Sequence, residues 1–424
     1  MPVWLGIDLG TSGVRACLID RDGEVLAESR TALPPSATPA PGAAEQRPER
    51  WWQAVLDAVD GLPPALLAEL AAIAVDGTSG TLLLCDRDGE PTSPALMYND
   101  RRATAEAERL SSIAPPQAVV QAPTSALAHL LWLLGQGHRG AHALHQADWI
   151  AFRLGAPLGT SDEHNALKLG YDPQARRWPD WLGETGVPTR LLPRVVPVGT
   201  PIGRLTPALR DRWGCRRAVT LVAGTTDSNA ATLASGIREI GEASTALGST
   251  LVLKILSPRP VFAPEYGVYS HRLGDRWLAG GASNAGGAVL RRFFDDARLA
   301  ELSARIDPSR DSDLDYYPLP APGERFPRND PQLEPRLSPR PDDEVVFLHG
   351  LLEGIARIER EGYRRLHELG APWPTRVAST GGGARNPVWT AIRQRLLGVP
   401  VAAAAQAEAA CGSARIAAGL VIPA

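Results

Sequence analysis

The sequence contains almost no lysine and no long uncharged apolar run. Lys168 and Lys254 are the only lysines among 44 basic residues, so arginine supplies nearly all the positive charge. We interpret this bias as codon usage rather than as adaptation to anionic partners. No uncharged apolar run reaches about 18 residues, and no basic stretch precedes an apolar one at the N-terminus. The sequence therefore predicts neither a membrane span nor a signal peptide.

Cysteine is also scarce, and the net charge is small. The 44 basic and 47 acidic residues leave a net charge of −3, which favours neither nucleic acid nor an anionic membrane as a partner. Cys17, Cys85, Cys215 and Cys411 lack the spacing of metal ligands. Cys17 and Cys85 lie in apolar strand patterns, where a buried free thiol is the usual state. We expect free thiols in a reducing, cytoplasmic compartment.

Two common nucleotide-binding motifs are missing. The chain has no Gly-Lys dipeptide, which excludes a phosphate-binding loop of the Walker type. The glycines of residues 6–13 lie in a strand–hairpin–strand pattern, which excludes the dinucleotide type. His138, His142 and His145 look like a metal cluster, but no matching acidic or thiol ligands surround them. We expect these histidines in a solvated helix or loop.

Strand and helix patterns alternate over most of the 424 residues, which are too many for one ordinary core. This alternation predicts α/β layers in two domains, residues 1–236 and 237–424, with room for a third. A three-strand meander opens the chain, residues 102–155 resemble a helical insertion, and residues 307–345 are irregular. Buried strands are expected at 70–76, 219–223 and 376–380, and helices at 48–60 and 345–369.

Two glycine-bearing turns, far apart in the chain, read almost as copies of one another. Residues 8–13 and 247–250 each connect two β-rich runs through glycine, threonine and serine. A tight hairpin of this kind points backbone N–H groups and hydroxyls at one spot, which suits a phosphate chain. The pair predicts a duplicated fold that grips a nucleotide from both sides.

Asp8 and Asp227 are the candidate functional acids. Asp8 stands in an otherwise apolar strand, where an unpaired carboxylate is costly to bury. A Mg²⁺ ion held through water would satisfy it, and hydrogen bonds from its own turn amides are the alternative. Asp227 follows a buried strand near the expected domain boundary. A general base would stand there if substrates bind between the domains, and a helix N-cap is the alternative.

Three consecutive glycines, residues 381–383, precede a helix start. Their backbone can approach a phosphate or a flat ligand closely, although a plain strand-to-helix loop explains a glycine run about as well. Asn386 and Trp389 follow, and they add a hydrogen-bonding group and an apolar surface for a base.

Taken in order, these motifs resemble the FGGY carbohydrate kinases of the actin-like, ribonuclease-H-like ATPase superfamily, over nearly the whole chain. Within that family, residues 76–86, 147–149, 164–171 and 224–228 are most similar to the short D-ribulokinases of cyanobacterial and plastid type. The family motifs match residues 8–13 and 247–250 (phosphate), 76–81 and 408–419 (connecting segments), 98–103, 160–166 and 317–327 (substrate domain and rim loop) and 381–386 (adenosine).

The resemblance implies two ribonuclease-H-like domains of α/β class with an active-site cleft between them. ATP and Mg²⁺ would serve to phosphorylate the terminal hydroxyl of a ketopentose, most favourably D-ribulose. Asp227 is the implied catalytic base and, with Asp8, an implied metal ligand. The implied sugar contacts are Asp8, Thr11, Ser12, Ser79 and Asp227. The implied ATP contacts are Thr11, Ser12, Gly13, Gly248, Ser249, Thr250, Gly382, Gly383, Asn386 and Trp389.

Alternatives remain within and outside the enzyme class. Xylulokinases typically carry Met-His-Gly where this chain has Thr78, Ser79 and Gly80, which weakens D-xylulose as the substrate, although xylulose, L-ribulose or a pentitol would fit the same class. The chain is shorter than most family members at its C-terminus, and we expect a monomer or weak homodimer. Nucleotide-switched chaperones and filament proteins share the two-lobed fold, but the sequence shows no added peptide-binding domain or assembly surface.

Overall fold

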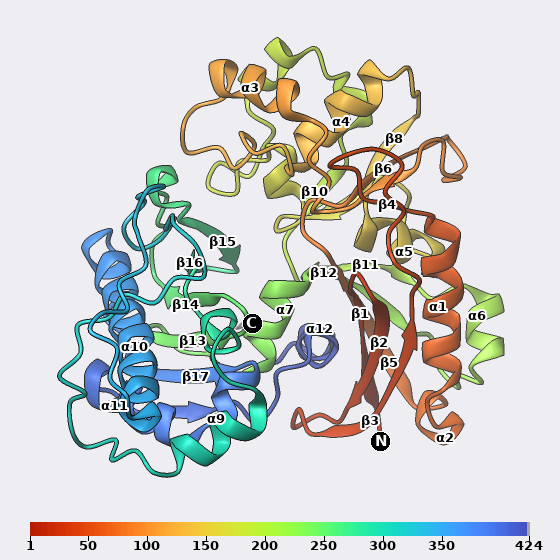
Figure 1. The fold of residues 1–424 in the computed structure, drawn as a ribbon. Coiled ribbons are helices and arrows are strands. Elements are labelled where there is room, and N and C mark those ends of the chain that lie inside the picture. The colour runs from red at the N-terminus through yellow and green to blue at the C-terminus, as the bar shows by residue number, and fades with distance from the viewer. Residues whose placement is uncertain (422–424) are drawn as a thin grey trace. The chain divides into compact units, whose positions relative to one another are not determined.

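The computed structural model describes residues 1–421 and separates the chain into two compact units. Unit 1 consists of Met1–Ala234, Arg272–Gly274 and residues 408–421, and unit 2 consists of Ser235–His271 and Asp275–Ala407. The boundary at Ala234 lies close to the one expected after residue 236. The units differ from the expected domains at the far end of the chain, because the segment from Glu408 packs on the N-terminal strands (Figure 1).

Unit 1 is built on a six-stranded mixed sheet in the order β11-β12-β5-β1-β2-β3. β1 pairs antiparallel with β2, as the expected meander requires, and parallel with β5, which is itself parallel to β12. The carboxyl ends of β12, β5 and β1 therefore meet at one edge. The strands are β1 (Val3–Leu9), β2 (Gly13–Ile19), β3 (Val25–Ala32), β5 (Leu70–Gly77), β11 (Pro201–Arg204) and β12 (Thr220–Thr226).

One face of this sheet carries large apolar side chains. Leu5, Ile7 and Leu9 of β1 are fully buried against the tryptophans of α1 (Pro48–Asp60) and α5 (Gln146–Leu154). Because side chains alternate along a strand, these three share a face, and burial of each contributes about 1.5–3 kcal/mol. Two shorter helices complete this part of the unit, α2 (Pro64–Leu67) and α6 (Pro207–Arg212).

The opposite face is lined by small residues and holds two helices at close range, α7 (Asp227–Ala234) and α12 (Ala409–Ala417) (Figure 1). A Cβ on Gly6 of β1 would lie 1.8 Å from the carbonyl oxygen of Ala410 in α12. A Cβ on Gly412 would lie 1.8 Å from the carbonyl oxygen of Ala230 in α7. Asp8, two residues after Gly6, belongs to this face.

Unit 1 also contains a second, smaller layer. Its four-stranded sheet runs β4-β7-β6-β8, and β9 pairs with β10. Apolar residues of this sheet and of α3 and α4 form a core of their own. The elements are β4 (Glu45–Gln46), β6 (Leu82–Cys85), β7 (Ala95–Leu96), β8 (His142–His145), β9 (Thr160–Asp162), β10 (Arg194–Val196), α3 (Thr104–Ile113) and α4 (Ala126–Gly135).

The expected helical insertion at residues 102–155 is therefore helical only in part. It contains α3, α4 and α5, but it also supplies β8, an edge strand of the four-stranded sheet. The expectation of solvated histidines is wrong for His145, which is fully buried. Its Nδ1 atom lies 2.9 Å from a carboxylate oxygen of Asp148, the residue three positions later in α5. His145 pairs with the buried Leu82 of β6, and its ring is therefore buried in unit 1.

Five strands of unit 2 repeat the topology of five strands of unit 1, and the sixth strand lies at the opposite edge of the sheet. Its sheet runs β15-β16-β14-β13-β17-β18, in which β13 pairs antiparallel with β14 and parallel with β17. β13, β14 and β17 thus correspond to β1, β2 and β5, and the expected duplicated α/β fold is confirmed. The strands are β13 (Glu242–Leu247), β14 (Leu251–Ser257), β15 (Tyr269–Leu273), β16 (Arg276–Ser283), β17 (Arg376–Thr380) and β18 (Val401–Ala403).

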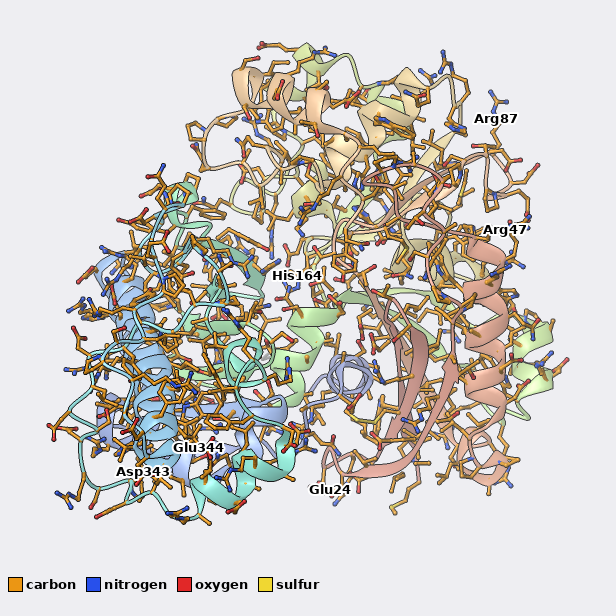
Figure 2. All side chains as sticks on the ribbon, in the orientation of Figure 1. Glu24, Arg47, Arg87, His164, Asp343 and Glu344 are labelled. Carbon is orange, nitrogen blue, oxygen red and sulfur yellow. A yellow bond between two sulfur atoms is a disulfide. The ribbon has the colours of Figure 1, made fainter. Side chains whose placement is uncertain are left out.

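The helices of unit 2 are α8 (Gly287–Leu290), α9 (Asp296–Ser303), α10 (Glu344–Glu368) and α11 (Pro387–Leu397). Asp343, labelled with Glu344 in Figure 2, caps α10 by accepting a hydrogen bond from the Val345 amide at 2.8 Å. None of the helices in the part of the chain described here combines the length and apolar character needed to cross a bilayer. Single 3₁₀ turns occur at Ala166–Leu169, Asp180–Thr185, Thr189–Leu191, Pro264–Tyr266 and Gly382–Arg385.

A buried ion pair lies at the centre of unit 2. Glu359 of α10 and Arg393 of α11 are both fully buried and are joined by two hydrogen bonds of 2.6 and 2.7 Å. Thr245 of β13 donates to Glu359 at 2.6 Å, and Arg393 donates to Ser379 of β17 at 2.7 Å. Burial alone would lower the pKa of Arg393, but Glu359 raises it above its usual value. The pair therefore ties two helices to two strands.

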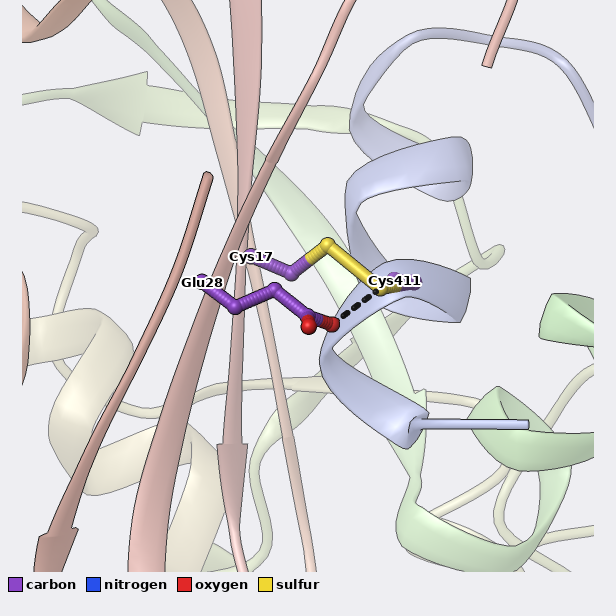
Figure 3. Close-up of side chains that lie close together, drawn as sticks. All are labelled: Cys17, Glu28 and Cys411. Atoms are coloured by element: carbon purple, nitrogen blue, oxygen red, sulfur yellow. Dashed lines mark hydrogen bonds between the residues drawn. A yellow bond between two sulfur atoms is a disulfide. The ribbon is translucent and has the colours of Figure 1, made fainter. Parts of the chain in front are cut away.

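The cysteines do not all follow the expectation of free thiols. Cys85 and Cys215 are free and buried, but Cys17 of β2 and Cys411 of α12 form a disulfide with 5.3 Å between their Cα atoms. Figure 3 shows this bond beside Glu28 of β3. The expected free thiol at Cys17 is therefore wrong. Since the two residues are 394 positions apart, only the docking of α12 on the sheet brings them together.

Candidate active site

Three acids of unit 1 gather where the parallel strands end. Asp8 is near the end of β1, Asp76 near the end of β5, and Asp227 directly follows β12. Asp8 and Asp76 are register partners, and Asp76 is also opposite Thr225 of β12. Asp76 therefore lies on the strand between the two acids singled out in the sequence. Ligands of α/β sheets typically bind at this edge, beyond the carboxyl ends of the strands.

Asp76 is the most confined of the three. Its side chain is fully buried, and one carboxylate oxygen accepts a 2.5 Å hydrogen bond from the hydroxyl of Ser413 in α12. Its Oδ1 atom is buried and has no hydrogen-bond partner among the described residues. Burial and the neighbouring Asp8 raise the pKa of Asp76 well above its usual value, with a further contribution from Asp227. The site is therefore short of positive charge.

Asp8 is buried and has one cationic partner. Arg15, across the hairpin on β2, donates to a carboxylate oxygen of Asp8 at 2.9 Å, and its Nε atom lies 3.2 Å from Glu408 at the start of α12. The partner of Asp8 is thus Arg15, and not the amides of its own turn, which were the alternative.

Asp227 is the half-buried first residue of α7. One of its carboxylate oxygens accepts a hydrogen bond from the adjacent Ser228 amide at 2.7 Å. Asp227 therefore occupies a helix-start position. It still belongs with Asp8 and Asp76, because its charge helps to raise the pKa of Asp76. A carboxylate at such a place is well fixed for accepting a proton.

The acids of this edge offer oxygen ligands for a hard divalent cation, but among the described residues their oxygens do not all lie within 4.8 Å of one another, so such an ion would be held partly through water. Asp8, Asp76 and Asp227 supply only oxygen atoms, and Asp76 Oδ1 has no other partner. Mg²⁺ prefers carboxylate and water oxygens and rejects sulfur. The sequence argument named Asp8 and Asp227 as ligands and missed Asp76. Asp76 ends an apolar strand just as Asp8 does, but only the pairing of β5 with β1 places the two acids together.

The loop after β5 is held rigidly beside these acids. Thr78 donates its amide and its hydroxyl to Gln146 Oε1 at 3.0 and 2.9 Å. Lys168, one of the two lysines, donates to the Ser79 carbonyl at 3.2 Å. Gly80 has φ +100°, a backbone conformation that favours glycine. Ser79, a proposed sugar contact, is therefore fixed by its neighbours and remains half-buried.

A polar segment that resembles the substrate-domain motif lies on the same side. The ring of His164 is 2.6 Å from the Thr225 hydroxyl, which places it beside the first turn of α7 (Figure 2). Asp162 accepts hydrogen bonds from the amides of His164 and Asn165. Burial, followed by the charge of Asp148, raises the pKa of Asp162 to about 6. These contacts connect residues 160–166 to the strand that leads into Asp227.

Unit 2 contains a pocket of about 480 Å³ at the second hairpin. Its lining comes from the turn between β13 and β14, from α8 and α9, and from the start of α11. A volume of this size suits a drug-sized or nucleotide-sized ligand. Of the ATP contacts expected in this unit, Gly248, Ser249, Gly382, Gly383, Asn386 and Trp389 line the pocket, and Thr250 completes the hairpin beside it.

Glycine backbone surrounds the second hairpin. A Cβ on Gly286 would lie 2.7 Å from the Ser249 carbonyl oxygen, and the Gly287 amide donates to the Gly248 carbonyl at 2.8 Å. On the other side Gly381 has φ +79°, and a Cβ there would lie 2.7 Å from the Leu247 carbonyl oxygen. Arg291, on the pocket wall, donates to the Ser249 hydroxyl at 2.7 Å. Two separate glycine segments, residues 286–287 and 381–383, thus bring their backbones against the hairpin.

Asn386 and Trp389 support the pocket from below. Asn386 caps α11 by accepting from the Trp389 amide at 3.0 Å and donates to the Ser303 hydroxyl at 2.9 Å. Trp389 is only 2% exposed, and its Nε1 donates to the Leu352 carbonyl at 3.0 Å. The indole therefore belongs to the core of unit 2 and forms the floor of the pocket with one edge.

The first hairpin, in unit 1, is also closed by a hydrogen bond from a glycine amide, but its loop is one residue longer. The Gly10 amide donates to the Gly13 carbonyl at 3.0 Å, as the Gly248 amide does to the Thr250 carbonyl at 3.2 Å. The Thr11 carbonyl accepts from Gln46 at 2.9 Å, which fixes the turn. Thr11 and Ser12 follow directly on the strand that carries Asp8.

Comparison with protein families decides between a carbohydrate kinase and a nucleotide-switched binding protein. Residues 3–234 match the N-terminal domain of the FGGY family of carbohydrate kinases, and residues 243–420 match its C-terminal domain. The chain belongs to the FGGY family of carbohydrate kinases. Kinases of this family use ATP and typically a divalent metal, and they act on small sugars.

Relatives of known name agree with this carbohydrate kinase assignment. The chain is 28% identical over 412 residues to the xylulose kinase of Escherichia coli, covering 91% of this chain and 83% of that protein. It is 26% identical over 412 residues to the xylulose kinase of Bacillus subtilis, covering 91% and 81%. A solved structure of a xylulose kinase from Brucella ovis superposes with a TM-score of 0.87 at 25% identity, covering 99% of this chain and 90% of that chain.

Proposed function

We propose that this FGGY kinase transfers the γ-phosphoryl group of ATP to the terminal hydroxyl of a ketopentose, with D-ribulose as the preferred acceptor. The observation that carries the proposal is the gathering of Asp8, Asp76 and Asp227 at one edge of the sheet in unit 1. Phosphoryl transfer needs a proton acceptor and oxygen ligands for a divalent cation, and this edge supplies both.

Asp227 is the proposed general base. Its carboxylate accepts the proton of the terminal sugar hydroxyl as that oxygen attacks the γ-phosphorus, and the bond from the γ-phosphorus to the β,γ-bridging oxygen breaks. The products are the sugar phosphate and ADP. The helix-start position holds the carboxylate in place through its contact with the Ser228 amide. A positioned base of this kind contributes about 10²–10⁴ in rate.

Mg²⁺ is the proposed cation, with Asp8 and Asp227 as ligands directly or through water and Asp76 as an added contributor. When bound, it neutralises charge on the phosphate oxygens. The chain's own part is to hold these carboxylates apart from bulk water. Burial of Asp8 and Asp76 and the contact of Arg15 with Asp8 do this.

The pocket of unit 2 is the proposed ATP site. Adenosine would lie over Gly382 and Gly383, with Asn386 and the edge of Trp389 beneath. The phosphates would meet Gly248, Ser249 and Thr250, and the proposed contacts of unit 1 are Thr11, Ser12 and Gly13. Close-packed glycine backbones let phosphate oxygens approach N–H groups without side-chain interference.

The choice of acceptor sugar follows from the loop that carries Ser79. Ser79 offers a hydroxyl where xylulokinases typically carry histidine, and this difference favours D-ribulose. Lys168 fixes the loop that presents the hydroxyl. The names of the relatives from Escherichia coli and Bacillus subtilis favour D-xylulose as the second candidate. Proposed sugar contacts are Asp8, Thr11, Ser12, Ser79 and Asp227.

A panel of sugars tests the proposal. Purified protein with Mg-ATP is expected to release ADP in a sugar-dependent, saturable manner, with the largest kcat/KM for D-ribulose and smaller values for D-xylulose, L-ribulose and pentitols. A larger kcat/KM for D-xylulose would replace the acceptor and leave the kinase assignment intact. ATP turnover that no sugar stimulates would instead favour a nucleotide-switched binding protein.

The ATP site has its own prediction. Ala300 of α9 lines the pocket and is exposed, so phenylalanine there would fill space without disturbing the core. We expect Ala300→Phe to weaken ATP binding at least about tenfold, a loss of about 1.4 kcal/mol, when measured by calorimetry.

Ala297 provides the matched control for this substitution. It is exposed on the same helix and lies outside the pocket lining. Ala297→Phe is expected to bind ATP as the unsubstituted protein does. Equal affinities for the two variants would move the ATP site away from this pocket.

A further inference from the structure

Helix α12 connects the disulfide to the acids of the proposed active site. Cys411 lies on α12 between Glu408, whose carboxylate is 3.2 Å from Arg15 Nε, and Ser413, whose hydroxyl is 2.5 Å from Asp76. Arg15 in turn donates to Asp8. The helix therefore holds both acids, one directly and one through Arg15, and the disulfide anchors it between these two contacts.

Helix α12 is packed closely against the elements that carry the three acids. It contacts β1, β5 and α7, which carry or begin with Asp8, Asp76 and Asp227. Gly6 and Gly412 allow backbone contact with β1 and α7, as described above. In such a close-packed interface a small displacement of the helix changes the surroundings of all three acids together.

The surroundings of the cysteine pair suit both redox states. Glu28 Oε1 lies 3.4 Å from Cys411 Sγ, as Figure 3 shows. In the oxidised state the sulfurs are bonded to each other. In the reduced state the Cys411 thiol has a carboxylate oxygen ready to accept its S–H. Both cysteines are buried, but Glu28 is exposed, and it lines a cavity of about 320 Å³ together with Ala16 and Ala410, the chain neighbours of Cys17 and Cys411.

We propose that Cys17 and Cys411 form a redox switch that sets the activity of the kinase through α12. The disulfide holds the helix against the sheet and keeps Ser413 and Glu408 in place. Reduction releases that tether, loosens α12 and lowers turnover. The inference rests on the proposed function, because it is the acids of that site that the helix positions.

The reductant is a dithiol. One of its thiolates attacks a sulfur of the pair and forms a mixed disulfide, and its second thiol then displaces the protein thiolate. The Cys17–Cys411 bond breaks, the pair gains two electrons and two protons, and the dithiol becomes a cyclic disulfide. Oxidation runs through the same steps in reverse, with a disulfide as oxidant.

The full chain is tested after equilibration in reduced or oxidised dithiothreitol. Alkylation and peptide mass mapping give the state of the Cys17–Cys411 pair. On reduction we expect kcat to fall by about 2- to 30-fold, the range of coupling through a packed element, and hydrogen exchange of α12 to accelerate. A kcat that does not change or that rises, with mass mapping showing complete reduction, would overturn the switch.

Matched variants separate the switch from a general thiol effect. Cys17→Ser and Cys411→Ser are expected to show the reduced kcat in both buffers. Cys215→Ser removes a buried free thiol of the same unit and is expected to respond as the unsubstituted protein does. Ser413→Ala is expected to shrink the kcat response while mass mapping still finds the disulfide. An equal response in Cys17→Ser and Cys215→Ser would contradict the proposal.

Two readouts do not require a sugar. Mass mapping and hydrogen exchange report the disulfide and α12 even if no sugar is phosphorylated, so failure of the proposed function and failure of the switch can be told apart. Intact-mass measurement under native conditions adds a further check. Zinc bound by Cys17, Glu28 and Cys411 in place of a disulfide would overturn the redox proposal.

Discussion

Replacing Asp227 with asparagine is expected to lower kcat by about 10²–10⁴-fold, the usual contribution of a positioned general base. Asparagine keeps the size of the side chain and can still accept from the Ser228 amide, but it cannot take the sugar proton. ATP affinity should stay within about twofold, because the pocket in unit 2 is unchanged. Coupled ADP-release kinetics and calorimetry with ATP measure the two effects separately.

Asp343 offers a matched control for this substitution. It also starts a helix and accepts a backbone hydrogen bond, but it lies at the exposed start of α10. Asparagine caps helices as well as aspartate does, so Asp343→Asn should turn over normally. Near-normal turnover of Asp227→Asn would remove Asp227 from the chemistry, whichever sugar is used.

Replacing Glu359 with alanine is expected to destabilise unit 2 by about 3–5 kcal/mol, because it leaves the Arg393 guanidinium buried without its counter-charge. The loss should be local to the elements that the pair joins. Hydrogen exchange of α10 and α11 at increasing urea concentration measures the free energy of opening there.

Two variants bracket this effect. Glu361 is on the same helix as Glu359 and forms a more exposed ion pair with Arg328. Glu361→Ala breaks this pair and should lower the free energy of unfolding by less than about 1 kcal/mol. Combining Glu359→Leu with Arg393→Met removes both charges and should restore much of the loss. A Glu359→Ala protein no less stable than Glu361→Ala would show that the buried pair is not a stabilising link.

The sequence was most informative where local chemistry repeats. The two glycine hairpins predicted the duplicated fold, because a strand–turn–strand pattern is set by residues next to each other in the chain. The helices expected at 48–60 and 345–369 match α1 and α10 closely, since their apolar periodicity is long and regular.

The sequence was least informative where contacts join distant segments. The docking of α12 on β1 brings Cys411 to Cys17 and Ser413 to Asp76, and neither pairing has a signal in residue spacing. Asp76 was overlooked for a different reason. It stands in the same pattern as Asp8, but a single buried acid is identified as part of a cluster only when strand order is known.

The contact between Gly6 and Ala410 also bears on how the protein is made. A ribosome synthesises α12 only after β1, α7 and the whole of unit 2, so the part of the small-residue face that α12 covers stays open while unit 2 emerges. Unit 1 can complete its own packing only then. The order of folding on the ribosome is therefore not the order of the chain, and nascent chains that stall before residue 409 carry an exposed sheet face open to chaperones.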